Sequence, residues 1–391
     1  MLRSSVLSVF AALVLVAFAG CKPAKEVSAV TPAALSMYIG VYTNQTGPSG
    51  VRAAGIYRIQ VDSAGKLTAP LHIDSGLINP SFVTLSADGR FLYAVEETGA
   101  EDADSTGHIR SFRVSPEGLI PINRQSTHGF YPCHVQVDRQ NQFVFVANYG
   151  GGIAMYPLSP DGGVAPSSAV QYHQAKGPHP RQDASHPHSV FLNPEETFLY
   201  VPDLGADRIY IYQIDRVTGK LLPAAQPYCS VAAGAGPRHV CFHPKLPIVY
   251  VINELNSTIT RLKRDSKTGQ LDVLESVSTL PADFQGTSLC ADIHISADGN
   301  FLYGSNRGHN SLACFTVDAR SGQLTPNGHV STQGDYPRNF AISPDGQWLL
   351  AANQKSDNLS AYRIQPNGGL DFKWSYTSPT PVCIQFYQPR D

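Results

Sequence analysis

The sequence predicts an all-β protein, a seven-bladed β-propeller with four antiparallel strands in each blade. Three observations carry this prediction: a turn that recurs about every 50 residues, a strand pattern that repeats with it, and chain ends that each supply part of one blade. The turn has the form Gly-x-Leu. It begins at Gly65, Gly219, Gly269, Gly322 and Gly368, with looser copies at Gly118 and Gly162.

One repeat illustrates the elements. Its β-branched and aromatic runs predict strands over residues 240–242, 248–252, 258–263 and 271–277. A Pro-rich turn separates the first two strands, and the Gly269 turn precedes the fourth. Four strands joined in this way are the unit of a propeller blade.

The remaining repeats follow the same plan. Turns rich in Asp and Gly, which accept a positive φ without strain, predict first hairpins. They lie at residues 87–89, 138–140, 194–196, 297–299 and 344–346. Third strands are expected at residues 56–61, 109–114, 153–158, 209–214, 312–317 and 359–364.

The two ends of the repeat region each lack part of a blade. Residues 38–42 look like a second strand with no first strand before it, and residues 381–384 look like a first strand with nothing after it. We expect the two to complete one blade and close the ring, which removes exposed sheet edges. The propeller domain is therefore assigned to residues 37–391. An open sandwich is the alternative, but its strand spacing is much shorter than this period.

Composition excludes some classes of function. Charged residues make up 15% of the 391-residue chain and the formal net charge is −2, against about 25% charged residues in an average domain. Such a chain has no bulk field that attracts nucleic acid or a membrane surface. We expect neither as a partner of the propeller, and we expect a monomer.

The N-terminus has the layout of an export signal. An apolar stretch follows Arg3, and small residues precede Cys21. Residues 1–20 are interpreted as a signal peptide, Cys21 as a lipidated cysteine of a bacterial lipobox, and residues 21–36 as a tether. Residues 17–19 also fit an ordinary A-x-A cleavage site. The expected location is periplasmic, with the membrane reached only through a lipid anchor.

Histidines and cysteines are the candidate metal ligands of this sequence. Six further cysteines are scattered without a C-x-x-C pair, which favours buried structural thiols. The loop over residues 171–188 carries His173, His179, His186 and His188, but their spacing matches no tight zinc motif. We expect no metal and no cofactor. A lid over the rim is the preferred interpretation of this long loop.

Two columns of polar residues are expected on one rim, because a hairpin brings the start of its first strand beside the end of its second. The first column follows a recurring proline and comprises Ser81, Cys133, His188, Arg238, Asp292 and Arg338. The second ends the next strand and comprises Thr43, Glu96, Asn148, Asp203, Asn253, Asn306 and Asn353, with Glu254 and Arg307 following directly. The Asn and Asp residues can also be simple loop caps. The arginines can also be structural ion pairs.

Six motifs in these columns resemble one known family. They occupy residues 187–190, 201–207, 236–239, 251–255, 305–308 and 352–354. Together they resemble the seven-bladed propeller lactonases, which include 6-phosphogluconolactonases and fungal 3-carboxy-cis,cis-muconate lactonizing enzymes. The resemblance implies a catalytic set of His188, Arg238, Glu254 and Arg307. Further substrate-binding candidates are His134, His186, Asp203, Asn253, Asn306 and Arg338.

These residue types suit the opening of a lactone, which needs water activation, oxyanion stabilisation and proton delivery to the ring oxygen. Arg238 and Arg307 are expected to clamp a carboxylate, a phosphate or the oxyanion. His188 and Glu254 share the roles of acid and base, with the assignment open. The expected partner is a small anionic sugar lactone. Phosphorylated sugar lactones arise in the cytoplasm, however. Export of the chain therefore argues against a phosphorylated substrate more than against a lactone substrate.

Two alternatives stay open. The same site could act as a cyclising isomerase on an unsaturated dicarboxylate, or the exported ring could be a non-catalytic binder.

Overall fold

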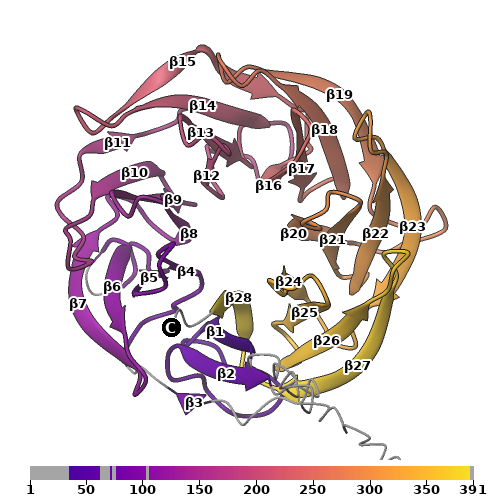
Figure 1. Cartoon of the computed structure of the whole chain (residues 1–391), viewed down its shortest axis with the longest axis horizontal. Coiled ribbons are helices and arrows are strands. Elements are labelled where there is room, and N and C mark those ends of the chain that lie inside the picture. The colour runs from indigo at the N-terminus through magenta and orange to yellow at the C-terminus, as the bar shows by residue number, and fades with distance from the viewer. Residues whose placement is uncertain (1–34, 62–70, 73–75, 103–104, 388–391) are drawn as a thin grey trace, which may run out of the picture. The chain divides into compact units, whose positions relative to one another are not determined.

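Seven four-stranded antiparallel sheets surround a central axis in the computed structural model of this chain (Figure 1). The structure describes residues 35–61, 71–72, 76–102 and 105–387. The sheets belong to the unit Ala34–Asp391. The predicted seven-bladed β-propeller is confirmed.

The strands run outward from the axis in chain order within each blade except the first, where β28 lies innermost. The first blade contains β28 (Pro381–Tyr387), β1 (Leu35–Val41), β2 (Tyr57–Val61) and β3 (Leu71–His72). The second contains β4 (Val83–Leu85), β5 (Phe91–Glu96), β6 (His108–Val114) and β7 (Leu119–Ser126). The third contains β8 (Pro132–Val137), β9 (Phe143–Asn148), β10 (Gly152–Pro157) and β11 (Ala169–Gln171).

The other four blades repeat this order. They contain β12 (Phe191–Leu192), β13 (Phe198–Asp203), β14 (Arg208–Asp215) and β15 (Lys220–Ser230); β16 (Pro237–Phe242), β17 (Ile248–Asn253), β18 (Thr258–Arg264) and β19 (Leu271–Ser278); β20 (Leu289–Ile295), β21 (Phe301–Arg307), β22 (Ser311–Val317) and β23 (Leu324–Ser331); and β24 (Pro337–Ile342), β25 (Trp348–Asn353), β26 (Asn358–Ile364) and β27 (Leu370–Thr377).

The first blade is built from both ends of the propeller, as the sequence predicts. β28 pairs antiparallel with β1, and the register places Met37 opposite Phe386 and Ile39 opposite Ile384. β1 begins at Leu35, two residues before the predicted domain boundary. The signal peptide, Cys21, most of the predicted tether and the Gly65 turn lie outside the described residues.

The repeated glycine turn joins neighbouring blades. The buried hydroxyls of three tyrosines each donate to the glycine carbonyl of a turn in the next blade. The pairs are Tyr200 with Gly269 at 2.7 Å, Tyr250 with Gly322 at 2.6 Å, and Tyr303 with Gly368 at 2.9 Å. These glycines have positive φ, which favours Gly. The turn is repeated in the sequence because each copy docks on the blade before it.

Each apolar core lies between two adjacent blades. Ile252 and Ile259 of the fifth blade, for example, pack with Leu302 and Phe315 of the sixth. All six cysteines among the described residues are free thiols. No described residue belongs to a helix long and apolar enough to cross a membrane.

Candidate active site

A β-bulge near the start of four innermost strands turns an extra side chain toward the axis. The register shifts lie between Pro132 and His134, Pro237 and His239, Cys290 and Ile293, and Pro337 and Asn339. At a bulge two residues oppose one, and the bulge re-aims a side chain. The residues released in this way are Cys133, Arg238, Ala291 with Asp292, and Arg338. The bulges therefore give a structural cause for four of the six residues predicted in the first column.

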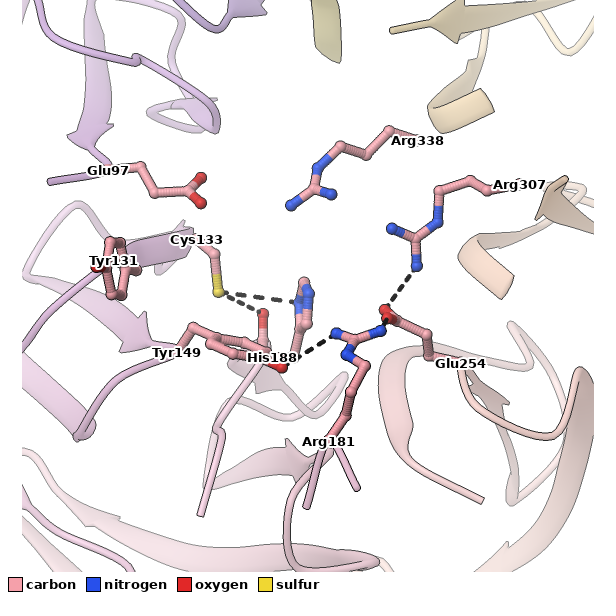
Figure 2. A pocket seen from close by; sticks show the side chains of 9 residues that line it. All are labelled: Glu97, Tyr131, Cys133, Tyr149, Arg181, His188, Glu254, Arg307 and Arg338. Carbon is pink, nitrogen blue, oxygen red and sulfur yellow. Dashed lines mark hydrogen bonds and ion pairs between the residues drawn. The ribbon is translucent and has the colours of Figure 1, made fainter. Parts of the chain in front are cut away.

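A cavity of about 410 Å³ opens at one end of the axis (Figure 2). Its lining combines residues of the first column with residues that directly follow the second strands of the blades. The lining residues are Glu97, Tyr131, Cys133, Tyr149, Arg181, His188, Glu254, Arg307 and Arg338. Three of the four residues predicted to be catalytic, His188, Glu254 and Arg307, thus share one cavity.

The second column lies one residue later than predicted. Asn253 and Asn306 have no exposed surface, whereas the next residues, Glu254 and Arg307, face the cavity. Successive side chains in an extended chain point to opposite sides, so only one residue of each pair can reach the axis. The column therefore contributes Glu97, Tyr149, Glu254 and Arg307.

The two predicted substrate-binding asparagines bind the protein itself. Asn253 Nδ2 donates to the hydroxyls of Thr258 and Thr260 at 2.9 and 2.8 Å. Asn306 Nδ2 donates to the Thr279 carbonyl at 2.8 Å. Neither residue lines the cavity, and the simpler interpretation as loop-fixing amides replaces substrate contact.

Asp203 also acts within the protein. Its carboxylate accepts from His173 Nδ1 at 2.9 Å, from the His186 backbone N–H at 2.7 Å and from the Ser185 hydroxyl. All three donors belong to the loop before β12. Asp203 holds this loop on the end of β13 and does not reach the cavity.

His134 and His186 lie outside the cavity as well. His134 lies deeper on the axis, where its ring contacts those of Phe82 and Phe191 at centroid distances of 4.3 and 4.8 Å. His186 stacks on Tyr149 at 4.3 Å and its Nδ1 lies 2.9 Å from the Tyr149 carbonyl oxygen. His186 therefore supports a cavity residue from behind.

Three guanidinium groups converge on the carboxylate of Glu254. Arg307 Nη2 lies 2.6 Å and Arg238 Nε 3.0 Å from Glu254 Oε2, while Arg181 Nη1 donates to Oε1. Burial opposes ionisation of Glu254, but these arginines hold its pKa well below the usual range. Glu254 is thus a fixed anion. Arg238 lies underneath the cavity and is 2% exposed.

His188 occupies the same wall as a neutral imidazole. Burial, and then the positive charges of Arg238, Arg338 and Arg307 together with His239, lower its pKa well below 6.5. Its Nδ1 lies 3.8 Å from Cys133 Sγ. Burial raises the pKa of the Cys133 thiol, so this sulfur faces the cavity as a neutral SH group.

Arg338 faces the cavity differently from the other arginines. It has no ion pair or hydrogen bond to any residue in the described part of the chain, and its guanidinium carbon lies 5.4 Å from the centre of the Tyr42 ring. Figure 2 shows it on the wall opposite Arg181, near Glu97. A guanidinium with unused donors is the natural receptor for an anionic group.

The loop before β12 contributes a residue that sequence reasoning missed. Arg181 reaches from this loop to Glu254 and donates to the Tyr149 hydroxyl at 3.1 Å. Fully buried Gln182 holds the loop beside it, because its Nε2 donates to the Leu204 carbonyl at 2.8 Å and to Asp207 Oδ1 at 2.7 Å. These hydrogen bonds attach the loop to the residues at and after the end of β13. The sequence predicts a lid over the rim at this position.

Three further cavity residues, Glu97, Tyr131 and Tyr149, are absent from the sequence-based prediction. Glu97 directly follows Glu96, and Tyr149 directly follows Asn148. Glu254 and Arg307 were identified as the residues that directly follow the second column, and the same rule identifies Glu97 and Tyr149. Tyr131 and Arg181 lie on loops whose paths no local pattern reveals. Among the described residues no group of three His, Cys, Asp or Glu side chains is placed to hold a metal ion.

Comparisons with known proteins agree with this architecture. The family model described as "Lactonase, 7-bladed beta-propeller" matches residues 36–386. A 6-phosphogluconolactonase of Bacillus subtilis is 36% identical over 354 residues, 89% of this chain and 97% of that protein. A 6-phosphogluconolactonase of Yersinia pestis is 34% identical over 313 residues, 79% of this chain and 87% of that protein. The solved structure of the Pseudomonas aeruginosa periplasmic gluconolactonase PpgL superposes with a TM-score of 0.85 at 33% identity, covering 91% of this chain and 99% of that one.

Proposed function

The chain belongs to the seven-bladed β-propeller lactonase family, and we propose that it is a lactone hydrolase that opens an anionic sugar lactone with water in the axial cavity. The observation that carries the proposal is the pairing, on one cavity wall, of the neutral His188 with guanidiniums that Glu254 holds in place. A neutral imidazole can take a proton, and fixed guanidiniums can stabilise an oxyanion.

In the proposed reaction His188 first accepts a proton and later returns it. The water oxygen bonds to the lactone carbonyl carbon while His188 takes one of its protons, and the carbonyl electrons move onto an oxyanion beside Arg307 and Arg181. The intermediate collapses by breaking the bond from the carbonyl carbon to the ring oxygen. His188 returns the proton to that oxygen. The product is an open-chain hydroxy acid, which releases one proton to solvent.

We assign the base to His188, because its imidazole is neutral and forms no ion pair with a described residue, whereas three guanidiniums engage the Glu254 carboxylate. Glu254 is assigned to positioning the arginines. Cys133 is left out of the chemistry, since only a thiolate is an effective nucleophile and burial raises the pKa of its thiol.

Arg338 and Glu97 suit the two ends of a sugar acid derivative. We assign Arg338 to an anionic substituent, because its donors are not used by the described residues. Glu97 accepts from the Tyr42 hydroxyl at 3.0 Å and faces the cavity, where a carboxylate can accept from sugar hydroxyls.

We also propose that the chain is exported and anchored through Cys21, on the layout of its first 21 residues. The similar Pseudomonas aeruginosa protein carries the description periplasmic gluconolactonase. Globomycin treatment of cells that produce the full chain tests the anchor: a precursor that accumulates supports lipidation, and normal processing contradicts it.

A lactone panel assayed by acid release in a pH-stat tests the function. Purified protein should hydrolyse 6-phosphogluconolactone or another anionic sugar lactone faster than neutral δ-gluconolactone. In Arg338→Gln the preference for the anionic lactone should shrink, because only that substrate loses an ion pair. Absence of acid release from every lactone would contradict the proposal. Cyclisation of a carboxymuconate would then indicate the isomerase, and binding without turnover the scaffold.

A further inference from the structure

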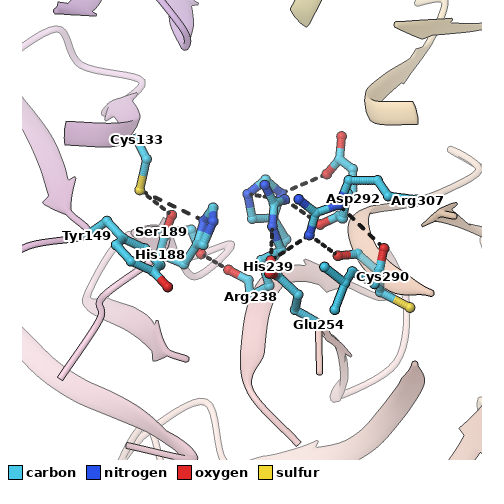
Figure 3. Close-up of polar contacts among 12 residues, drawn as sticks. Cys133, Tyr149, His188, Ser189, Arg238, His239, Glu254, Cys290, Asp292 and Arg307 are labelled. Carbon is cyan, nitrogen blue, oxygen red and sulfur yellow. Dashed lines mark hydrogen bonds and ion pairs between the residues drawn. The ribbon is translucent and has the colours of Figure 1, made fainter. Parts of the chain in front are cut away.

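A chain of polar contacts joins Arg238, His239 and Asp292, three residues that lie outside the cavity lining (Figure 3). Arg238 Nη1 lies 3.2 Å from His239 Nε2, and His239 Nδ1 lies 2.8 Å from Asp292 Oδ1. Arg238, His239 and Asp292 are each at most 3% exposed. The contacts link β16 to β20, the innermost strands of two neighbouring blades.

The contacts determine which nitrogen of His239 carries the hydrogen. A guanidinium has only donors, so His239 Nε2 must present its lone pair to Arg238. The hydrogen is then on Nδ1, where it is donated to Asp292. A carboxylate that fixes the tautomer of a functional histidine is a recurring arrangement in proteins.

Asp292 also contacts a second histidine, His294, and the pKa values of the two histidines shift in opposite directions. His294 Nε2 lies 3.0 Å from Asp292 Oδ2. Although burial opposes protonation, Asp292 raises the pKa of His294. The same carboxylate fails to do so for His239, because burial and then Arg238 lower its pKa to about 4. Burial, reinforced by Arg238, therefore keeps His239 neutral.

Asp292 is itself held firmly. It accepts from Asn339 Nδ2 at 2.6 Å and from the Ile293 backbone N–H at 2.9 Å, in addition to the two histidines. A carboxylate with this many donors cannot rotate freely, so its position is transmitted to the His239 ring.

His239 and its neighbours restrict the plane of the Arg238 guanidinium. Nη1 also donates to the Ala291 carbonyl at 2.5 Å, and Nε lies 3.0 Å from Glu254 Oε2. Nη2 makes no hydrogen bond to any other described residue. With Nη1 and Nε engaged, the guanidinium keeps one orientation, and that orientation holds Glu254 from below.

We propose that His239, fixed by Asp292 as the Nδ1–H tautomer, is a positioning residue that orients Arg238 and through it the Glu254 carboxylate at the floor of the cavity. Its kinetic consequence rests on the proposed lactonase function, whereas the tautomer and the contact with Arg238 do not. A small misplacement of reacting groups can cost on the order of 100-fold in rate, so the effect is measurable.

Two substitutions at His239 separate orientation from packing. His239→Phe keeps a ring for the edge contacts with Phe82, His134 and His188 and removes the acceptor. His239→Gln supplies an amide oxygen that can accept from Arg238. We expect kcat to fall by roughly 10- to 100-fold in the Phe variant with KM little changed, and to be largely restored in the Gln variant.

His294→Gln is the matched control. This histidine contacts the same carboxylate at a similar distance but does not touch Arg238, so kcat should stay close to that of the unsubstituted protein. Equal losses in the Phe and Gln variants of His239, or an unaffected Phe variant, would overturn the proposal. Circular dichroism of each variant verifies the fold.

The tautomer provides a readout that needs no substrate. Nitrogen-15 shifts of His239, assigned with the Gln variant, should show a neutral Nδ1–H ring between pH 6 and 8, and Asp292→Asn should alter that signature. A hydrogen on Nε2, or titration near the ordinary histidine pKa of about 6.5, would overturn the inference. If no lactone is hydrolysed, the proposed function fails. The nitrogen-15 shifts still test whether His239 accepts from Arg238 and so orients it.

Discussion

His188 and Glu254 share one cavity, and the arginines around them act on the two residues in opposite ways. Positive charge makes protonation of His188 harder and makes loss of the Glu254 charge harder too. One residue therefore stays neutral and the other stays anionic at neutral pH. The same set of guanidiniums thus keeps His188 available as a base and Glu254 as a fixed counter-ion.

The first prediction concerns His188. His188→Gln should lower kcat by on the order of 100-fold or more if His188 transfers the proton, with a smaller change in KM. Because its pKa is well below 6.5 in the folded protein, kcat/KM should stay level from pH 8 through 6.5 and fall only in more acidic buffer. A pH-rate profile with an acid limb centred at 6.5 or above would contradict this role.

The second prediction concerns Glu254. Glu254→Gln leaves buried guanidiniums without their counter-ion, and removal of one partner of a buried pair typically costs about 3–5 kcal/mol. Three arginines hold the pKa of Glu254 in the folded protein below its ordinary value of 4.5. Its contribution to stability is therefore present above pH 4.5 and lost as the pH falls through the folded pKa.

Thermal unfolding of both proteins checks this prediction. At pH 7 the Tm of Glu254→Gln should be lower, and the difference should narrow in acid below pH 4.5, where the unsubstituted protein loses the same contribution. A difference that widens as the pH falls would contradict the assigned charge state.

At the scale of elements, the loop before β12 delivers a side chain. Asp203 and Gln182 attach it on either side of Arg181, and Arg181 spans from Tyr149 to Glu254. A long connection on a rim favours a functional loop, but the structure shows a loop whose backbone is held by buried side chains.

The third prediction follows from that attachment. Gln182→Ala removes the amide that holds the loop, so kcat/KM should fall toward the value of Arg181→Gln, and trypsin should cleave after Arg181 more readily. Lys176→Gln, an exposed change on the same loop, is the control and should leave kcat/KM unchanged. Full activity in Gln182→Ala together with a large loss in Arg181→Gln would show that the attachment is dispensable.

The fourth prediction concerns the repeated glycine turn. An added Cβ at Gly368 (φ +77) would lie 2.1 Å from Phe301 of the preceding blade, whereas at Gly346 (φ +68) it would meet open space. Gly346→Ala should cost only the backbone strain, roughly 1–2 kcal/mol. Gly368→Ala should cost about 1–3 kcal/mol more through overpacking.

The order of the two Tm values measures this difference. Gly368→Ala should unfold at the lower temperature, since it alone disturbs the contact between blades. Equal Tm values would mean that the turn repeats for its backbone conformation and not for docking.

At the scale of the whole molecule, the ring could be predicted from the sequence and the site only in part. The period, the hairpin turns and the split first blade are local patterns, so the seven blades and their closure by β28 and β1 follow from them. His188, Glu254 and Arg307 were found because a motif marks each strand end. These features depend on residues close in the sequence.

The remaining site residues depend on geometry that has no local signature. Whether Asn253 or Glu254 faces the axis is decided by one residue of strand alternation. The loop path that brings Arg181 to Glu254 is a tertiary feature. Arg338 is predicted by the column pattern, but the bulge that turns it toward the cavity is a feature of the folded ring. Arg238 follows from the same column pattern as His188, yet only the ring geometry keeps it out of the cavity lining.

The most direct test of the account is a crystal structure of the protein with a sugar δ-lactam bound as a non-hydrolysable lactone analogue, phosphorylated at its terminal carbon. We expect the lactam carbonyl oxygen within hydrogen-bond distance of Arg307 or Arg181, its carbonyl carbon facing His188, and the phosphate on Arg338. An analogue bound away from the axis, or one whose carbonyl lies out of reach of both His188 and these arginines, would contradict it.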